Sequence, residues 1–134
     1  MHSSIHSAVR AAKSRPKNLN LLTVRFPLSA VMSVGHRAAG ILLFLALPYF
    51  LYLLQLSLSG ESGFLQVKND LNNIWLKLVL LVFIWALAHH FVAGIRYFLL
   101  DLDIGIERQT AQKSALLVMI LGVLVTAIAA FFLF

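Results

Sequence analysis

The stretch LVLLVFIWALAHHFVAGIRYFLLD, residues 78–101, joins a long apolar run to side chains that lipid accepts poorly. Residues 78–88 are entirely apolar, whereas the rest of the stretch carries His89, His90 and Arg96. Crossing the hydrocarbon core of a bilayer takes about 20 helical residues, so the segment around this stretch is long enough to span a membrane. Its ionisable groups are functional candidates, because such groups are rare at membrane depth.

The composition of the whole chain agrees with a lipid environment. Hydrophobic residues make up 60% and charged residues 12% of the 134 positions, and the mean hydropathy is +0.89. Soluble proteins carry about twice this share of charge. A chain of this length is at most one domain and cannot bury so much apolar surface inside itself. The chain is therefore predicted to be an integral membrane protein surrounded by lipid.

Several classes of site are excluded by what the chain lacks. It has no cysteine, so it cannot hold a disulfide, an iron–sulfur cluster or a thiolate metal site. It contains neither a GxGxxG nor a P-loop pattern, so nothing indicates a nucleotide site. The net charge of +6 does not point to nucleic acid, because six of the eleven basic residues lie within the first 37 positions, as an orientation signal does.

Three segments are long and apolar enough to be transmembrane helices, the form that lipid requires because it offers no partner for open backbone groups. They cover about residues 28–58, 74–100 and 114–134. The first is expected to begin near Pro27, which favours the first helical turn, and to kink at Pro48. The predicted fold is all-α, with a basic N-terminal arm over 1–26 and a three-helix membrane anchor over 27–134.

Basic residues in the short flanks predict the orientation. They gather before the first span and around the loop between the second and third spans: Arg10, Lys13, Arg15, Lys17, Arg25, Arg37, Arg96, Arg108 and Lys113. The positive-inside rule then predicts a cytoplasmic N-terminus and a periplasmic C-terminus. The basic arm is very short for a mitochondrial transit peptide, so a bacterial inner membrane is preferred to the mitochondrial one.

Helical periodicity sorts the polar residues of the first two spans into stripes, because residues three, four, seven and eleven apart share a face. One stripe holds His90, Gly94, Tyr97 and Asp101, and the other holds Ser33, His36, Arg37, Gly40 and Phe44. His89 points about 100° away from His90, so the two adjacent histidines cannot serve one site side by side. The plain interpretation of both stripes is close packing at glycines, with polar groups joining the helices. For His89 that interpretation means packing or an interfacial contact.

His90 is the residue that packing explains least well. It lies about 16 Å below the cytoplasmic boundary at Asp101, close to the bilayer midplane. A neutral imidazole with glycine one turn on and alanine one turn back suits an axial ligand of haem, and packing or a proton relay are the alternatives. His36 is expected near the inner boundary, well short of His90 in depth. A six-coordinate iron would then need its second histidine from another polypeptide.

Ser33 and Arg37 are expected one turn apart at the inner mouth of the first span. A hydroxyl and a cation at that place could hold the carbonyl of a quinone or the propionates of a haem. An ordinary serine beside a positive-inside arginine is the alternative. Arg96, near the cytoplasmic boundary, is interpreted as a polar group that joins two helices, and it can also snorkel or pair with Asp101 or Asp103.

Two stretches resemble a known family, the cytochrome b membrane subunit of succinate dehydrogenase (respiratory complex II). The first is RPKNLNLLTVRFPLSAVMSVGHRAAG, residues 15–40, with the family's RP, its HR pair and a serine three residues before HR. The second is HFVAGIRYFLLD, residues 90–101, with H-x-x-x-G-I-R and a later aspartate. The resemblance extends over about residues 15–134 and includes all three spans.

The resemblance implies roles for individual residues. His90 matches the axial ligand of haem b, whose other histidine comes from a second, smaller anchor subunit. Ser33 and Arg37 match residues that line the ubiquinone site, and His36 and Arg37 match residues close to the haem propionates. Asp101 matches an acidic residue on the same side. The sequence departs from the family at Ala39, Tyr97, Leu100 and Asp103. A propionate contact through a histidine at position 97 is therefore in doubt, although Tyr97 could still donate from its hydroxyl.

The chain is accordingly expected to be the haem b-binding membrane anchor of succinate dehydrogenase, contributing to the ubiquinone site and docking the flavoprotein and iron–sulfur subunits. It would not oxidise succinate itself, because that step needs a flavin, and the electrons need clusters that a cysteine-free chain cannot ligate. A fumarate reductase-type anchor is the alternative within redox chemistry. A small structural or transport membrane protein without haem is the alternative from another class, and no nucleic-acid partner is expected.

Overall fold

The computed structural model describes residues 26–134, which form helices and no strand. The helices are α2 (Leu28–Leu58), α3 (Glu61–Asp70), α4 (Ile74–Asp101) and α5 (Arg108–Leu133). Three of these, α2, α4 and α5, are long and apolar enough to cross a membrane. The expectation of an all-helical chain with three candidate spans is thereby confirmed for the described residues. The predicted basic arm lies outside them, apart from Phe26.

Two features of the helix pattern were not expected from hydropathy. Helix α3 (Glu61–Asp70) is short and polar, and the chain turns into it at Gly60, whose φ of +135° suits glycine rather than a residue with a side chain. Helix α5 begins at Arg108, earlier than the residue 114 expected for the third span. Its first turn is polar, and a helix can extend past the hydrocarbon region without an apolar signal.

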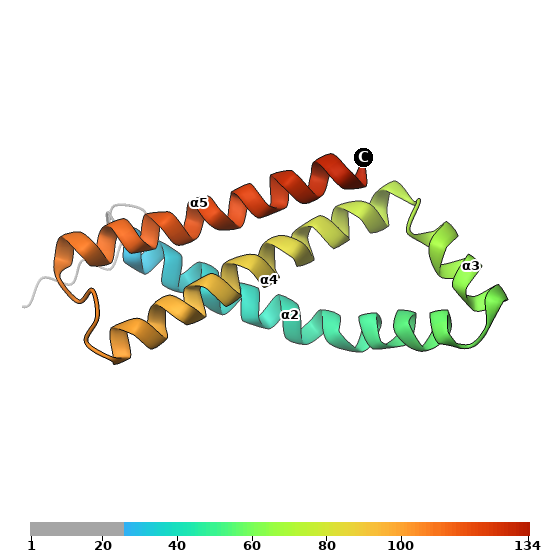
Figure 1. The fold of residues 1–134 in the computed structure, drawn as a ribbon, viewed down its shortest axis with the longest axis horizontal. Coiled ribbons are helices and arrows are strands. Elements are labelled where there is room, and N and C mark those ends of the chain that lie inside the picture. Colours follow the sequence, from blue (N-terminus) through green and yellow to red (C-terminus); the bar gives the residue numbers. More distant parts are fainter. Residues whose placement is uncertain (1–25) are drawn as a thin grey trace, which may run out of the picture.

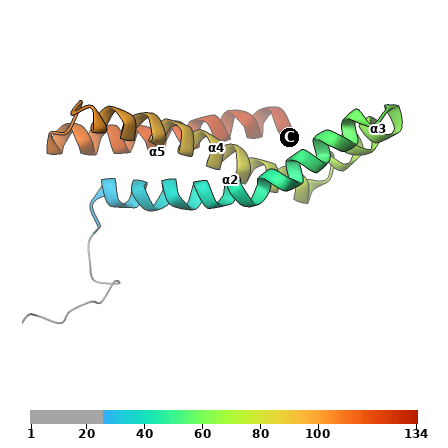
Figure 2. The ribbon, with the colours of Figure 1, turned by 90° about the horizontal axis from the view of Figure 1, so that it is seen from below.

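The helices are arranged as a hairpin crossed by a third helix. In Figure 1, α4 and α5 run side by side in opposite directions, and α2 crosses α4 obliquely. Helix α3 connects α2 to α4 at the end of the molecule where the chain terminates. Helix α2 continues through Pro48, and its axis changes direction in its second half (Figure 2), as expected for an internal proline.

The helices meet mostly through small side chains, and Met32 is the largest side chain that is fully buried between them. Met32, Ala93, Ala115 and Val118 form the buried cluster where α2, α4 and α5 come together. Ala39 and Ala86 are also fully buried. Small residues let helix backbones approach closely, which is how helices associate in lipid, where burying apolar surface gives no advantage over leaving it in the bilayer.

Large apolar side chains cover the outside of the molecule. Phe44 on α2 is 75% exposed and Phe131 on α5 is 82% exposed, and many leucines and valines are exposed in the same way. A soluble protein does not present such a surface, whereas a bilayer accepts it. The core that remains is small and places its polar groups at the helix crossings, where the candidate site lies.

Candidate functional site

His36 and His90 meet where α2 crosses α4. Their rings are stacked, with centroids 4.1 Å apart and planes 8° from parallel. Nδ1 of His90 also lies 3.1 Å from the backbone carbonyl oxygen of His36. A carbonyl can only accept a hydrogen bond, so this contact requires the proton of a neutral His90 on Nδ1. Nε2 then carries a free lone pair, which is the form of imidazole that binds a metal ion.

Small residues surround the His90 ring. A Cβ at Gly40 would lie 3.0 Å from Cε1 and 3.4 Å from Nδ1 of His90, so the α2 backbone touches the ring there. On α4 a Cβ at Gly94 would meet nothing within 4 Å. A hollow of about 400 Å³ opens along this part of α4, lined by His90, Phe91, Gly94, Ile95 and Phe98. The ring is therefore held from one helix and borders open space along its own.

The expected difference in depth between His36 and His90 is wrong, because their rings are in contact. The sequence predicts that the first span begins near Pro27, and α2 does begin at Leu28, so the error lies in the register of α2 against α4. The parallel stack also keeps His36 beside the His90 ring, with no space between the two rings for a macrocycle.

Ser33 and Arg37 lie on the same stretch of α2 as His36. Ser33 is half-buried and Arg37 is exposed. Neither side chain makes a hydrogen bond to another residue within 26–134. Their donors therefore remain available, at least with respect to the described part of the chain. The structure brings His36 and His90 together and leaves Ser33 and Arg37 as neighbours along one helix.

Tyr97 and Asp101 follow His90 along α4. The Tyr97 ring meets His36 edge to face, with centroids 5.2 Å apart, and so extends the aromatic group of His36 and His90 toward the end of α4. Asp101 is the last residue of α4 and is exposed. The tyrosine that departs from the resembled family thus packs against the predicted propionate residue His36.

His89 occupies a different interface from His90, as helical periodicity predicts. It is only 3% exposed and its ring stacks on Trp85, with centroids 5.3 Å apart. The ring fits between two glycines, because a Cβ at Gly35 would lie 2.9 Å from its Nε2 and one at Gly122 would lie 3.4 Å from its Cβ. Among the described residues Nε2 has no hydrogen-bond partner. His89 is a packing residue of the three-helix core.

The interpretation of Arg96 as a polar group joining two helices is confirmed, and within the described residues it does not pair with Asp101 or Asp103. Arg96 is 7% exposed and faces α5. Its Nε donates to Oγ of Ser114 at 2.9 Å and its Nη2 donates to the carbonyl of Ala111 at 3.0 Å. The sequence did not identify Ser114 as the partner, because that residue was used only to mark where a span begins. A hydroxyl in the first turns of a span was the available signal, but its partner depends on how the two helices pack.

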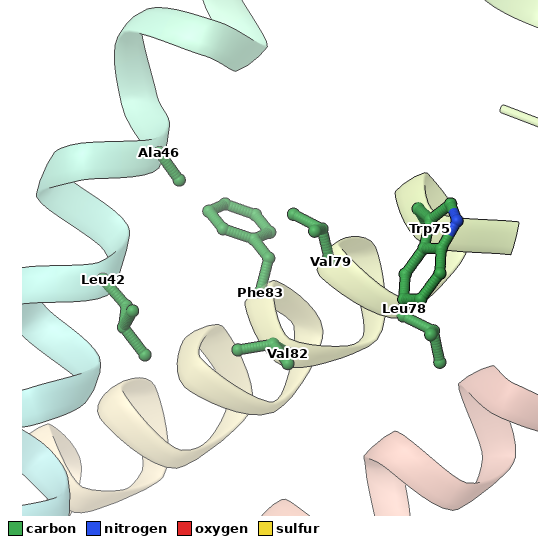
Figure 3. A pocket seen from close by; sticks show the side chains of 7 residues that line it. All are labelled: Leu42, Ala46, Trp75, Leu78, Val79, Val82 and Phe83. Carbon is green, nitrogen blue, oxygen red and sulfur yellow. The ribbon is translucent and has the colours of Figure 1, made fainter. Parts of the chain in front are cut away.

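A second hollow lies between α2 and α4, closer to α3. Its volume is about 340 Å³. In Figure 3 the side chains of Leu42 and Ala46 on α2 face those of Val82 and Phe83 on α4. The indole of Trp75 brings the only polar side-chain atom among the residues that line it. The residues that line it offer no group for acid–base chemistry or metal binding.

Comparison with known proteins identifies the family of this chain. A family model described as the succinate dehydrogenase/fumarate reductase transmembrane subunit matches residues 11–130. The succinate dehydrogenase cytochrome b556 subunit of Coxiella burnetii is 33% identical over 116 residues, which are 86% of this chain and 93% of that protein. The subunit of the same name from Paracoccus denitrificans is 28% identical over 103 residues, covering 76% and 78% of the two chains. That of Rickettsia bellii is 28% identical over 112 residues, covering 84% and 87%.

Proposed function

Because this chain belongs to the succinate dehydrogenase/fumarate reductase transmembrane subunit family, as its motifs predict, we propose that it is the haem b-binding membrane anchor of a succinate:quinone oxidoreductase. The family and the three long apolar helices make it a multi-pass membrane protein. Its relatives are named as cytochrome b556 subunits, which motivates haem b as the cofactor. The same family includes the transmembrane subunits of fumarate reductases, so the anchor of a fumarate reductase is the second candidate function.

The observation that carries the haem assignment is the contact of His90 with α2. Nδ1 points at the carbonyl of His36, which leaves Nε2 as the ligand atom. Ligating histidines almost always donate their other N–H to a carbonyl, a carboxylate or water. Gly94 leaves the flank of His90 open, where a larger residue would project into the hollow. The residues present therefore fit a haem, which would supply a one-electron redox centre within the membrane.

The second axial ligand would come from outside the described chain. His36 stacks on one face of the His90 ring with the two rings in contact, so these two histidines would not hold a haem between them. Its position beside the ligand fits a contact to a propionate instead, together with Arg37. We therefore retain a second small anchor subunit as the source of the other histidine.

The quinone site is assigned to Ser33 and Arg37. A quinone carbonyl oxygen accepts hydrogen bonds, and these two side chains offer a hydroxyl and a guanidinium without hydrogen-bond partners among the described residues. Both are on the helix that also contacts His90, so one helix would border the haem and the quinone. Reduction of a quinone to a quinol takes two electrons and two protons, and the role of Ser33 and Arg37 would be to bind and orient the carbonyl.

The remaining parts of the enzyme must come from partners. This chain has no cysteine, so iron–sulfur clusters would be held by another subunit, and succinate oxidation would belong to a flavoprotein. We propose that the anchor docks both from the side of its basic N-terminus. That side is the cytoplasm of a bacterium, with the C-terminus in the periplasm.

An optical spectrum of the assembled complex tests the assignment with two matched variants. His90→Leu removes the proposed ligand, and His89→Leu makes the same change in the neighbouring residue. We expect a low-spin b-type spectrum in the parent complex and in His89→Leu, because His89 faces the helix core. His90→Leu should lose the low-spin signal.

Two outcomes would overturn the proposal. A parent complex without any Soret absorption would favour a structural or transport anchor. Loss of the low-spin spectrum in His89→Leu, together with its retention in His90→Leu, would show that His89 and not His90 is the ligand. Assembly is checked in each case by recovery of the partner subunits with the anchor.

A further inference from the structure

We propose that Gly40 and the backbone carbonyl of His36 are positioning elements that tune the His90 imidazole as a ligand. The inference rests on the proposed haem role of His90. It adds a structural cause for the strength with which the imidazole donates electrons to the iron. Helix α4 supplies the imidazole, whereas one turn of α2 fixes its orientation, its tautomer and its electron donation. Gly40 is assigned a task that a residue with a side chain cannot perform.

The geometry of a helix explains why this position requires glycine. In an α-helix the carbonyl of one residue accepts the N–H of the residue four positions later, which for His36 is Gly40. A carbonyl oxygen has a second lone pair, so it can accept another hydrogen bond from outside the helix. Nδ1 of His90 occupies this second position at 3.1 Å. A Cβ on residue 40 would stand 3.0 Å from Cε1 and 3.4 Å from Nδ1, and so would push the ring away.

The His36 side chain holds the same ring from another direction. Its imidazole covers one face of His90 at 4.1 Å, and Tyr97 in turn meets the His36 ring at 5.2 Å. The His90 ring can therefore neither rotate freely nor shift along α2. The carbonyl contact is kept in one geometry, and Nε2 is kept in one direction.

A hydrogen bond to the remote nitrogen makes the other nitrogen a better electron donor. Partners of this kind fix the tautomer and raise the basicity of metal-ligating histidines, and hydrogen bonding around the ligands is one of the means by which proteins set haem potentials. Stronger donation stabilises ferric over ferrous iron. Loss of the carbonyl contact should therefore raise the midpoint potential of the haem.

The test compares Gly40→Ala with Gly35→Ala in the assembled complex. Both variants add one Cβ to α2 at nearly the same distance from an imidazole, 3.0 Å from His90 in one case and 2.9 Å from His89 in the other. Potentiometric titration of the haem spectrum is the measurement. We expect Gly40→Ala to keep a low-spin haem and to shift its reduction equilibrium roughly tenfold, or about 59 mV upward for one electron. Gly35→Ala should keep the parent potential.

Equal shifts in both variants would overturn the inference, because they would report a general change in the distance between α2 and α4. An unchanged potential in Gly40→Ala would overturn it as well. A parent complex without haem would instead refute the proposed function on which the inference rests. These failures are distinguishable by the spectrum of the parent complex alone.

A second experiment is independent of the Gly40 substitution. In a His90→Gly complex, added imidazole should restore the low-spin spectrum by occupying the place of the side chain. 1-Methylimidazole cannot donate from its remote nitrogen and should bind about two- to tenfold more weakly, the effect of one neutral hydrogen bond. 4-Methylimidazole is equally bulky but retains the N–H, and it serves as the control for size. Equal binding of all three ligands would exclude the carbonyl contact.

Discussion

The contact of Arg96 with α5 leads to a prediction about the stability of the packing between α4 and α5. Removing the Ser114 hydroxyl should destabilise this packing more than removing the Arg96 guanidinium. Ser114→Ala deletes the hydroxyl that accepts from Nε of Arg96 at 2.9 Å. Only 7% of Arg96 is exposed, so the substitution leaves Nε without a partner in a region that water does not reach. A hydrogen bond to a charged group contributes about 1.5–3 kcal/mol. We expect Ser114→Ala to destabilise the packing of α4 against α5 by about this amount.

Arg96→Met should destabilise this packing less, although each of the two substitutions removes two of the three hydrogen bonds that join Arg96, Ser114 and Ala111. The carbonyl of Ala111 still accepts from Ser114 Oγ at 3.1 Å, so no buried polar atom of α5 loses its last partner. Removing one partner of a buried charge is costly because the charge stays behind uncompensated, and Arg96→Met leaves no such charge. The variant with both substitutions should be as stable as Arg96→Met alone, because once the guanidinium is gone the loss of the Ser114 hydroxyl leaves no buried charge without a partner.

The assay uses the absence of cysteine in the chain. Val118→Cys places a thiol on α5 at a site that is 2% exposed, so a maleimide reaches it only when the helices separate. Labelling of the anchor in the assembled complex then reports how often α4 and α5 open. We expect Ser114→Ala to raise the opening equilibrium roughly 10- to 150-fold over the Val118→Cys reference. Unchanged labelling in Ser114→Ala, or faster labelling in Arg96→Met than in Ser114→Ala, would refute this account of the Arg96 contact.

Three further predictions address the quinone site, the end of α5 and the orientation. Ser33→Ala should lower the rate of quinone reduction several-fold and Arg37→Ala about tenfold or more, and Arg37→Lys should not restore the rate because lysine lacks the guanidinium fork. Succinate oxidation with a water-soluble acceptor is the control. Normal rates of quinone reduction in all three variants would show that these residues only pack. Lys77→Met should accelerate amide hydrogen exchange at the end of α5, because Nζ donates to the carbonyl of Leu133 at 2.7 Å, and unchanged exchange would show that this contact does not hold the helix end. An alkaline phosphatase domain fused after Phe134 should be active in bacterial cells, since that enzyme works only in the periplasm, and an inactive but intact fusion would contradict the predicted orientation.

The sequence by itself determined the class of the protein and the faces of its helices. Whether a segment enters the membrane depends on the length and composition of its own apolar stretch. The spans that contain Pro48 and His90 can therefore be recognised without knowledge of how they pack. Helical periodicity is equally local, and it correctly separated His89 from His90. The motifs around Ser33 and His90 identified the family, because they preserve residue types at fixed spacings. Short polar helices such as α3 give no comparable signal, since neither length nor hydropathy distinguishes them from a loop.

The tertiary structure decided which polar groups meet. His36 touches His90 because α2 and α4 cross at Gly40, and a depth counted along each helix separately could not give that register. Arg96 turned to Ser114 for the same reason, since the partner of a buried guanidinium depends on the neighbouring helix and not on charges nearby in sequence. Hydropathy measures the exchange of a segment between water and lipid, which is a property of that segment alone. Contacts between segments depend on crossing angle and close packing, and these arise only when glycine and alanine from different helices come together.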